Sequence, residues 1–195
     1  MRIAGLIAYT IVALVSSKEG SAAGSLLEAT RSIGAPVGFV SACHRYSWLC
    51  SSTSGREMPD AEALSLLKRV NGHVNATVTS ADDLAVYGKQ DFWSLPTNGR
   101  GDCEDYALQK KKDLFDAGFK SDHLAMTVVL DRNGRNHAVL LARLKGGDYV
   151  LDNLTSGVRS WESTGYTFLA RQSFENQRVW KVILAGPRAR QFSGA

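Results

Sequence analysis

One stretch of the sequence, "GRGDCEDYALQKKKDLF" (residues 99–115), places a cysteine between acidic residues just ahead of a run with helical spacing. Cys103 follows Asp102 and is followed by Glu104 and Asp105. A thiol in the first turn of a helix meets unpaired backbone N–H groups and the positive end of the helix dipole, which lower its pKa and supply donors for an oxyanion. Cys103 is therefore a candidate nucleophile.

A cysteine nucleophile requires a base that takes its proton and a partner that fixes the tautomer of that base. His137, near the start of one expected strand, and Asp152, near the end of the next, supply both in the order Cys, His, Asp. The alternative is that His137 merely terminates a strand and that Cys103 is a buried residue at a helix start. The competing bases are His44, His73 and His123, and the fallback partners of His137 are Asn153 and Asp148.

The spacing of His137 and Asp152 raises a geometric problem. If the hairpin between their strands centres on Gly146 and Gly147, Asp152 lies opposite Leu141, on the same face as His137 but about 13 Å farther along the strand. A β-bulge or a strong strand twist is then needed to bring the two side chains together.

Two helices are expected from the spacing of apolar residues. The first covers residues 60–74 and follows Pro59. The second begins at Cys103, with Asp102 as its cap and Gly118 at its end. The polar run Lys110-Lys111-Lys112 is expected on the solvated face of this second helix.

Residues 80–96, which precede the second helix, are expected to be irregular. Strands follow the second helix in quick succession. The turn at Asn133-Gly134 and the "KGGD" turn separate the first three strands, which makes them antiparallel neighbours. Helices followed by an antiparallel sheet predict an α+β fold. The expected strands cover residues 125–131, 136–144, 149–155 and 179–185.

Residues 1–23 have the layout of a secretory signal peptide, with Arg2, an uncharged apolar run and a small-residue stretch that ends at Ala23. The alternative, a membrane anchor, needs about 20 apolar residues, and the run is shorter than that. We therefore expect a soluble periplasmic or secreted protein. Residues 24–195 form its single domain, with a flexible lead-in over residues 24–36 and a tail over residues 187–195.

The charge of the chain argues against nucleic acid as a partner. The formal net charge is +4, and it falls to +3 once the signal peptide is removed. The sequence also has no basic stripe interleaved with aromatic residues, which is the pattern that nucleic-acid binding favours.

Export changes how the three cysteines are interpreted. In an oxidising compartment two of them are expected to pair, and Cys43 and Cys50 lie close together in the loop-like segment "SACHRYSWLC". The alternatives are two buried thiols, or a metal site completed by His44. Cys103 is then the unpaired cysteine.

Several blocks of the sequence resemble the bacterial transglutaminase-like cysteine proteinases. The blocks are "GRGDCEDYALQKKKDLFDAGF", "NHAVLLAR" and "YVLDNL", with "RVNGHVNATV", "DDLAVYGKQDFW" and "FVSACHRYSWLC" upstream. The resemblance covers most of residues 36–155. It implies a papain-like, transglutaminase-type core in which the nucleophile begins a helix that packs on an antiparallel sheet. It also implies that Cys103 is the nucleophile, His137 the general base and acid, and Asp152 the residue that orients His137.

The resemblance further implies calcium. Family members that release adhesins bind calcium through the acidic residues that flank the nucleophile, which are here Asp102, Glu104 and Asp105. Bare carboxylates oppose thiolate formation, whereas a bound cation neutralises them, and oxygen ligands suit calcium. The alternative is that these acids complement the helix dipole, each contributing about 0.3–1 kcal/mol.

The sequence therefore predicts a cysteine endopeptidase that acts on a protein or peptide through a thioester acyl-enzyme. The resemblance suggests a surface or periplasmic protein, such as an adhesin, as the substrate. A transglutaminase or amide transferase on the same core is the alternative, because water or an amine could release the thioester. A non-catalytic binding module is a third reading, which the intact Cys103, His137 and Asp152 argue against.

Overall fold

The computed structural model describes residues 24–52 and 55–192 of the chain. The signal peptide expected over residues 1–23 lies outside the described residues, and so does the end of the expected tail, residues 193–195. Within the part that is described, no helix is long and apolar enough to cross a membrane.

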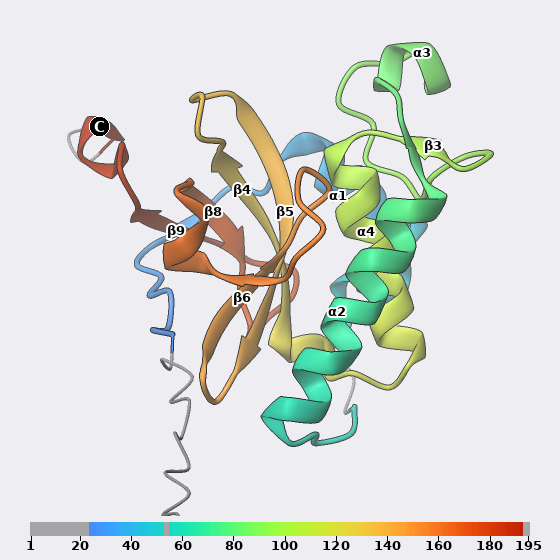
Figure 1. Cartoon of the computed structure of the whole chain (residues 1–195). Coiled ribbons are helices and arrows are strands. Elements are labelled where there is room, and N and C mark those ends of the chain that lie inside the picture. The colour runs from blue at the N-terminus through green and yellow to red at the C-terminus, as the bar shows by residue number, and fades with distance from the viewer. Residues whose placement is uncertain (1–23, 53–54, 193–195) are drawn as a thin grey trace, which may run out of the picture.

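The fold is α+β, as predicted. A seven-stranded sheet has the strand order β1-β9-β8-β4-β5-β6-β7, with antiparallel pairing throughout, and the helices α2 and α4 lie side by side against it (Figure 1). The sheet strands are β1 (Ser32–Ile33), β4 (Leu124–Leu130), β5 (Asn136–Leu144), β6 (Gly147–Leu151), β7 (Arg159–Ser160), β8 (Thr167–Gln172) and β9 (Trp180–Ala185). The helices are α1 (Val37–Arg45), α2 (Asp60–Thr77), α3 (Asp83–Tyr87) and α4 (Cys103–Asp116), and a short parallel pair joins β2 (Thr79–Ser80) to β3 (Arg100–Gly101).

Helix α4 begins at Cys103, as predicted, and packs on β5. Its buried apolar residues include Leu108 and Leu114, which recur at helical spacing on the face toward the sheet. The helix ends at Asp116, and Gly118 follows with a φ of +80°, a left-handed conformation that glycine adopts without steric cost.

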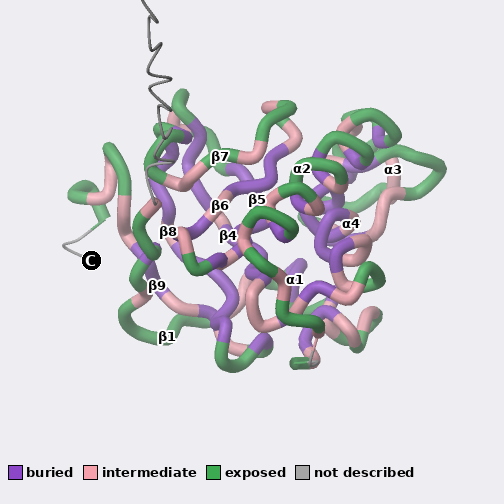
Figure 2. Tube along the Cα trace, turned by 60° about the horizontal axis from the view of Figure 1, so that its bottom comes forward, coloured by how far each residue is buried: buried purple, intermediate pink, exposed green. Residues whose placement is uncertain are grey.

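Within the described residues, two large apolar clusters lie on opposite faces of the sheet, and a small third one consists of Val74, Val78 and Tyr106. Along β5, Leu140 and Ala142 join the cluster on the side of α4, whereas Val139 and Leu141 join the cluster on the opposite side. Figure 2 shows the central strands and α4 as the most buried parts of the chain, with β1 and α3 more exposed. A strand that is covered on both faces reads as a continuous apolar run, which is why β5 was placed correctly from the sequence.

The turn between β5 and β6 differs from the prediction. Leu144 pairs with Gly147, so the turn residues are Lys145 and Gly146 instead of Gly146 and Gly147. The carboxylate of Asp60, at the start of α2, accepts the Gly146 N–H at 2.7 Å. This contact holds the turn one residue earlier than predicted. As a result, each residue of β6 lies opposite a β5 residue two positions earlier than predicted.

The first described residues do not form the flexible lead-in that was expected over residues 24–36. Leu27 is 1% exposed, and its N–H donates to Asp148 Oδ2 at 2.7 Å. The Ser25 N–H donates to Glu162 Oε1 at 2.6 Å, and β1 pairs with β9 at the sheet edge. Buried apolar area and backbone hydrogen bonds therefore fix this segment to the domain.

Cys43 and Cys50 form a disulfide, and their Cα atoms are 5.7 Å apart. The bridge ties α1 to the short 3₁₀ helix Ser47–Cys50. It confirms the expected pairing and excludes the alternatives of two thiols or a metal site with His44. Among the described residues, Cys103 is the free cysteine.

The expectation that Lys110, Lys111 and Lys112 form a solvated face is wrong for the first two. Lys110 and Lys111 are each 1% exposed. Lys111 Nζ donates to Leu124 O at 3.1 Å and to two glutamine oxygens, Gln172 Oε1 and Gln177 Oε1, each at 2.6 Å. Burial lowers the pKa of Lys111 well below its usual value and lowers that of Lys110 to about 7, although the charge of Asp152 opposes the second effect.

The Lys111→Met variant is expected to lower the free energy of unfolding by about 1–3 kcal/mol, because it removes the donor that Lys111 provides to three buried acceptors. Chemical denaturation measures this difference. Lys112→Met is the matched control, since Lys112 lies on the same helix in a surface ion pair with Asp116, and such pairs contribute only about 0–1 kcal/mol. Equal stability of the two variants would contradict a structural role for Lys111.

Candidate active site

Cys103 and His137 line one cavity of about 330 Å³ at the N-terminal end of α4. Cys103 is the first residue of α4, and His137 is the second residue of β5. The structure thus brings together two of the predicted site residues from different elements. The cavity is lined by Pro36, Asp91, Trp93, Cys103, Glu104, Val128, Val129, Asn136, His137, Ala138 and Leu169.

His137 is hydrogen-bonded to Asp152, with 2.9 Å between Nε2 and Oδ1. The two residues are 8% and 3% exposed. In the observed register Leu140 pairs with Leu151, and the same register places Asp152 opposite Val139. Val139 is two residues from His137, whereas the predicted partner, Leu141, is four residues from it. The predicted need for a bulge between these strands is therefore wrong, because the earlier turn already brings the two side chains together.

Several residues hold the Asp152 carboxylate and backbone in place. Oδ1 also accepts the Leu154 N–H at 3.0 Å, and Oδ2 accepts the Tyr166 O–H at 2.6 Å. The Asp152 N–H donates to Asn71 Oδ1 at 3.1 Å, and its carbonyl accepts from Asn75 Nδ2 at 2.9 Å. Burial raises the pKa of Asp152, but the hydrogen bonds outweigh burial and leave this pKa below its usual value.

Tyr166 is a site residue that the sequence analysis missed. Its ring meets the His137 ring edge to face, with 5.9 Å between centroids and an interplanar angle of 87°. It contacts both members of the His137–Asp152 pair and so restricts the orientation of each. Tyr166 immediately precedes β8, a strand that was not predicted, so no spacing signal tied it to the site.

The alternative partners and bases lie elsewhere. Asp148 is paired with Arg143, with 2.7 Å between Oδ2 and Nη2. The Oδ1 atom of Asn153 is buried and makes no hydrogen bond within the described part of the chain. The three other histidines do not line the cavity with Cys103: His44 and His73 are exposed, and His123 lines a different cavity.

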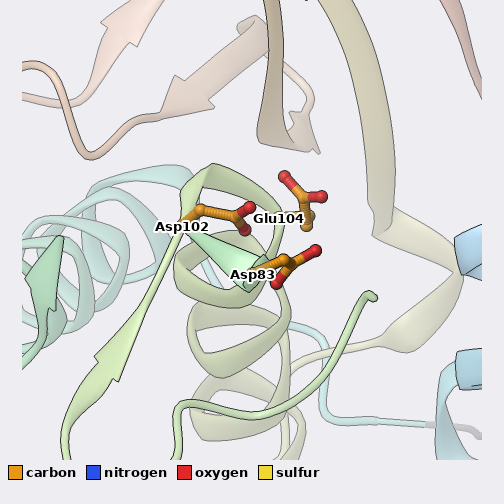
Figure 3. A group of neighbouring side chains, drawn as sticks. All are labelled: Asp83, Asp102 and Glu104. Carbon is orange, nitrogen blue, oxygen red and sulfur yellow. The ribbon is translucent and has the colours of Figure 1, made fainter. Parts of the chain in front are cut away.

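A group of three carboxylates lies beside the thiol. Asp83 of α3, Asp102 and Glu104 each offer an oxygen within 4.8 Å of the others (Figure 3). Asp105, which was predicted as a third ligand, is outside this group. Its Oδ1 accepts the Ser94 N–H at 2.8 Å and its Oδ2 accepts the Tyr87 O–H at 3.0 Å. Asp83 takes its place, although the sequence analysis expected only irregular structure around it.

Asp102 occupies the N-cap position of α4, as predicted, and its carbonyl accepts the Tyr106 N–H at 3.1 Å. Among the described residues, its side chain makes no capping hydrogen bond to α4. Its carboxylate is directed toward Asp83 and Glu104 instead (Figure 3). Its Oδ1 and Asp83 Oδ1 are buried and have no hydrogen-bond partner within the described residues.

Two of these carboxylates, Asp83 and Asp102, have raised pKa values. Burial and the charge of Glu104 raise the pKa of Asp102 to about 9, and burial raises the pKa of Asp83 as well. Closely spaced carboxylate oxygens that lack hydrogen-bond donors are the ligands that a hard divalent cation such as calcium prefers. This group of carboxylates therefore fits a cation of that class.

The same carboxylates oppose ionisation of the thiol. Cys103 Sγ donates to Glu104 Oε2 at 3.0 Å. Burial, Glu104 and Asp102 raise the pKa of Cys103, and the backbone of Ala138 partly offsets them with a hydrogen bond. The negative charge beside Cys103 therefore disfavours the thiolate.

Comparisons with known proteins point to one family. The sequence matches a family model described as bacterial transglutaminase-like cysteine proteinase over residues 29–187. The structure resembles calcium-bound LapG of Legionella pneumophila with a TM-score of 0.54 at 22% identity, covering 68% of this chain and 74% of that one. The likeness supports the fold. The search of curated proteins found no match.

Two further LapG structures from Legionella pneumophila also match. The EGTA-treated form has a TM-score of 0.48 at 25% identity, over 55% of this chain and 61% of that one. The other has a TM-score of 0.49 at 24% identity, over 60% and 65% of the respective chains. The chain thus spans from 61% to 74% of the length of the LapG chains that it matches.

The Glu104→Gln variant is expected to react faster with iodoacetamide at Cys103 than the unchanged protein, at the same pH and with a chelator present. Loss of the Glu104 charge lowers the raised pKa of the thiol and increases the fraction of thiolate. Mass spectrometry measures the rate of labelling. Asp113→Asn, on the same helix, is the control and should leave the rate unchanged; equal rates for both variants would contradict this account.

Proposed function

The chain belongs to the bacterial transglutaminase-like cysteine proteinases, and we propose that it is an endopeptidase whose catalytic residues are Cys103, His137 and Asp152. The observation that carries the proposal is the cavity that Cys103, at the start of α4, lines together with His137, which is hydrogen-bonded to the buried carboxylate of Asp152. This arrangement supplies a nucleophile, a base and an orienting group in one place.

The proton transfers follow from the orientation of His137. Its Nε2 is bonded to Asp152, which leaves Nδ1 as the nitrogen that takes the proton of the Cys103 thiol. The thiolate then attacks the carbonyl carbon of the peptide bond, and the N–H groups at the start of α4 face the developing oxyanion. His137 returns its proton to the leaving amine as the C–N bond breaks, which leaves a thioester on Cys103. Water that His137 deprotonates then attacks this thioester, the C–S bond breaks, and the acid product leaves while Cys103 regains its proton from His137.

Tyr166 acts in this scheme as a positioning residue. Its hydroxyl donates to the Asp152 oxygen that His137 does not use, and its ring contacts the imidazole. It therefore holds the carboxylate in the orientation that keeps a proton on Nε2 and leaves Nδ1 free for the thiol.

Asp83, Asp102 and Glu104 are the residues that would hold calcium, the ion bound in one of the LapG structures. When bound, calcium neutralises the carboxylates beside Cys103 and lowers the pKa of the thiol. The buried, unpaired oxygens of Asp83 and Asp102 support this assignment, because desolvated carboxylates without a donor destabilise the folded protein unless a cation or a proton accompanies them.

The substrate we propose is a surface or periplasmic protein, such as an adhesin. The signal peptide expected over residues 1–23 supports export to the periplasm or beyond, and the family supports a protein substrate. Export also agrees with the disulfide between Cys43 and Cys50, since disulfides persist in oxidising compartments.

Cys103→Ala and His137→Ala are each expected to abolish cleavage, because they remove the nucleophile and the base. The assay incubates purified protein with calcium and a proteome-derived peptide library, and mass spectrometry identifies new peptide ends. Thermal unfolding checks that both variants remain folded. Cleavage retained in either variant would refute the proposed triad, and peptides joined to amines instead of cut would favour the transferase.

Asp83→Asn is expected to weaken calcium binding by about tenfold or more, because affinity depends on the number of charged ligands. Binding should also strengthen as the pH rises through about 9, since calcium competes with the proton whose pKa burial and Glu104 raise on Asp102. Isothermal titration calorimetry measures both effects. Asp113→Asn is the control, and calcium affinity that is unchanged in Asp83→Asn would remove Asp83 from the site.

A further inference from the structure

A second cavity, of about 340 Å³, lies next to the catalytic one. The two share Pro36, Val128 and Leu169 in their linings, so they lie next to each other. Arg31 is the one charged residue among those that line the second cavity, whereas the catalytic cavity has Asp91, Glu104 and His137. The lining residues are Arg31, Ile33, Gly34, Ala35, Pro36, Val128, Leu169, Ala170, Trp180, Val182, Leu184 and Phe192.

The position of this cavity follows from how the helices cover the sheet. Helices α2 and α4 contact β4, β5 and β6, at one side of the sheet. The second cavity is lined by residues of β8, β9 and β1. These strands lie on the other side of β4 (Figure 1). Ala170 and Trp180 in its lining belong to the same core cluster as Leu140 and Leu108, so it lies on the face of the sheet that α4 covers elsewhere.

The sheet is irregular at the point where the two cavities join. Val128 pairs with Ala170 and Val129 with Phe168, so Leu169 is an extra residue relative to β4. On the other side of β8, Phe168 pairs with Ala185 and Ala170 pairs with Val182. Leu169 therefore lies opposite two residues of β9, Ile183 and Leu184. Bulges of this kind redirect side chains and are common beside active sites.

Leu184 is one of those two β9 residues, and its backbone has a φ of +54°. A left-handed conformation is unfavourable for a leucine and persists only where the surrounding structure enforces it. Here the conformation accompanies a side chain that lines the cavity. The bulge at Leu169 and the left-handed backbone of Leu184 thus both occur at leucines that line the second cavity.

We propose that this second cavity is a substrate subsite that binds apolar side chains of the polypeptide to be cleaved, close to the scissile bond on one side. The inference rests on the proposed endopeptidase function: because the second cavity shares Pro36, Val128 and Leu169 with the cavity of Cys103, a peptide bound at Cys103 is its occupant. Its volume is at the lower end of that of ligand sites and matches a few side chains instead of a folded partner. Leu169 and Leu184 are its specificity-determining residues.

The test selects binders from a random peptide library displayed on phage, with Cys103→Ala protein and calcium, so that binding does not depend on turnover. The expected result is enrichment of Leu, Ile, Val or Phe at one fixed position. Adding Leu184→Asn should weaken the selected peptides by about tenfold, the order found for one apolar side chain in a pocket. Asparagine tolerates the left-handed conformation, so this variant should keep its fold.

Leu26→Asn is the matched control, since Leu26 is an exposed leucine (44%) outside the cavity, and it should leave binding unchanged. Selection without an apolar position, or equal affinities in the Leu184→Asn and Leu26→Asn backgrounds, would overturn the subsite. The selected peptides are then offered to the protein with Cys103 intact. If the selected peptides bind in a way that depends on Leu184 but are not cleaved, the result would support the subsite and refute the endopeptidase function.

Discussion

The packing of α4 on β5 is the constraint on which the rest of the site depends. Leu108 and Leu114 bury one face of the helix against Leu140 and the other apolar residues on that side of the sheet. This contact fixes the position of the first helical residue relative to the sheet. Cys103 is the first residue of the helix, so the same contact sets the thiol beside the start of β5 and His137. The catalytic geometry is thus a consequence of ordinary hydrophobic burial.

Electrostatics at the start of α4 oppose the chemistry that the backbone geometry favours. The helix N-terminus attracts a thiolate, whereas Asp102 and Glu104 repel it, and burial strengthens the repulsion because it excludes water. The thiol of Cys103 thus lies between two opposed influences, the helix N-terminus and the carboxylates beside it. Under the proposed function, a cation bound by these carboxylates would remove the second of them.

Local sequence signals predicted the parts of the fold that depend on local physics. The start of α4, the end near Gly118 and the bounds of β5 follow from periodicity and turn chemistry, and all three agree with the structure. The register of the β5–β6 hairpin was wrong because Asp60, far away in the sequence, holds the turn. Asp83, Tyr166 and buried Lys111 were missed for the same reason, since their partners lie in distant segments.

The pairing of β1 with β9 joins the beginning of the domain to its last strand. Residues 32–33 can take up their place only after residues 180–185 have been synthesised, because β9 is the strand that receives them. A contact between such distant segments forms slowly and late in folding. A chain still being synthesised would therefore keep this edge of the sheet open, and closure of the domain would coincide with the arrival of β9.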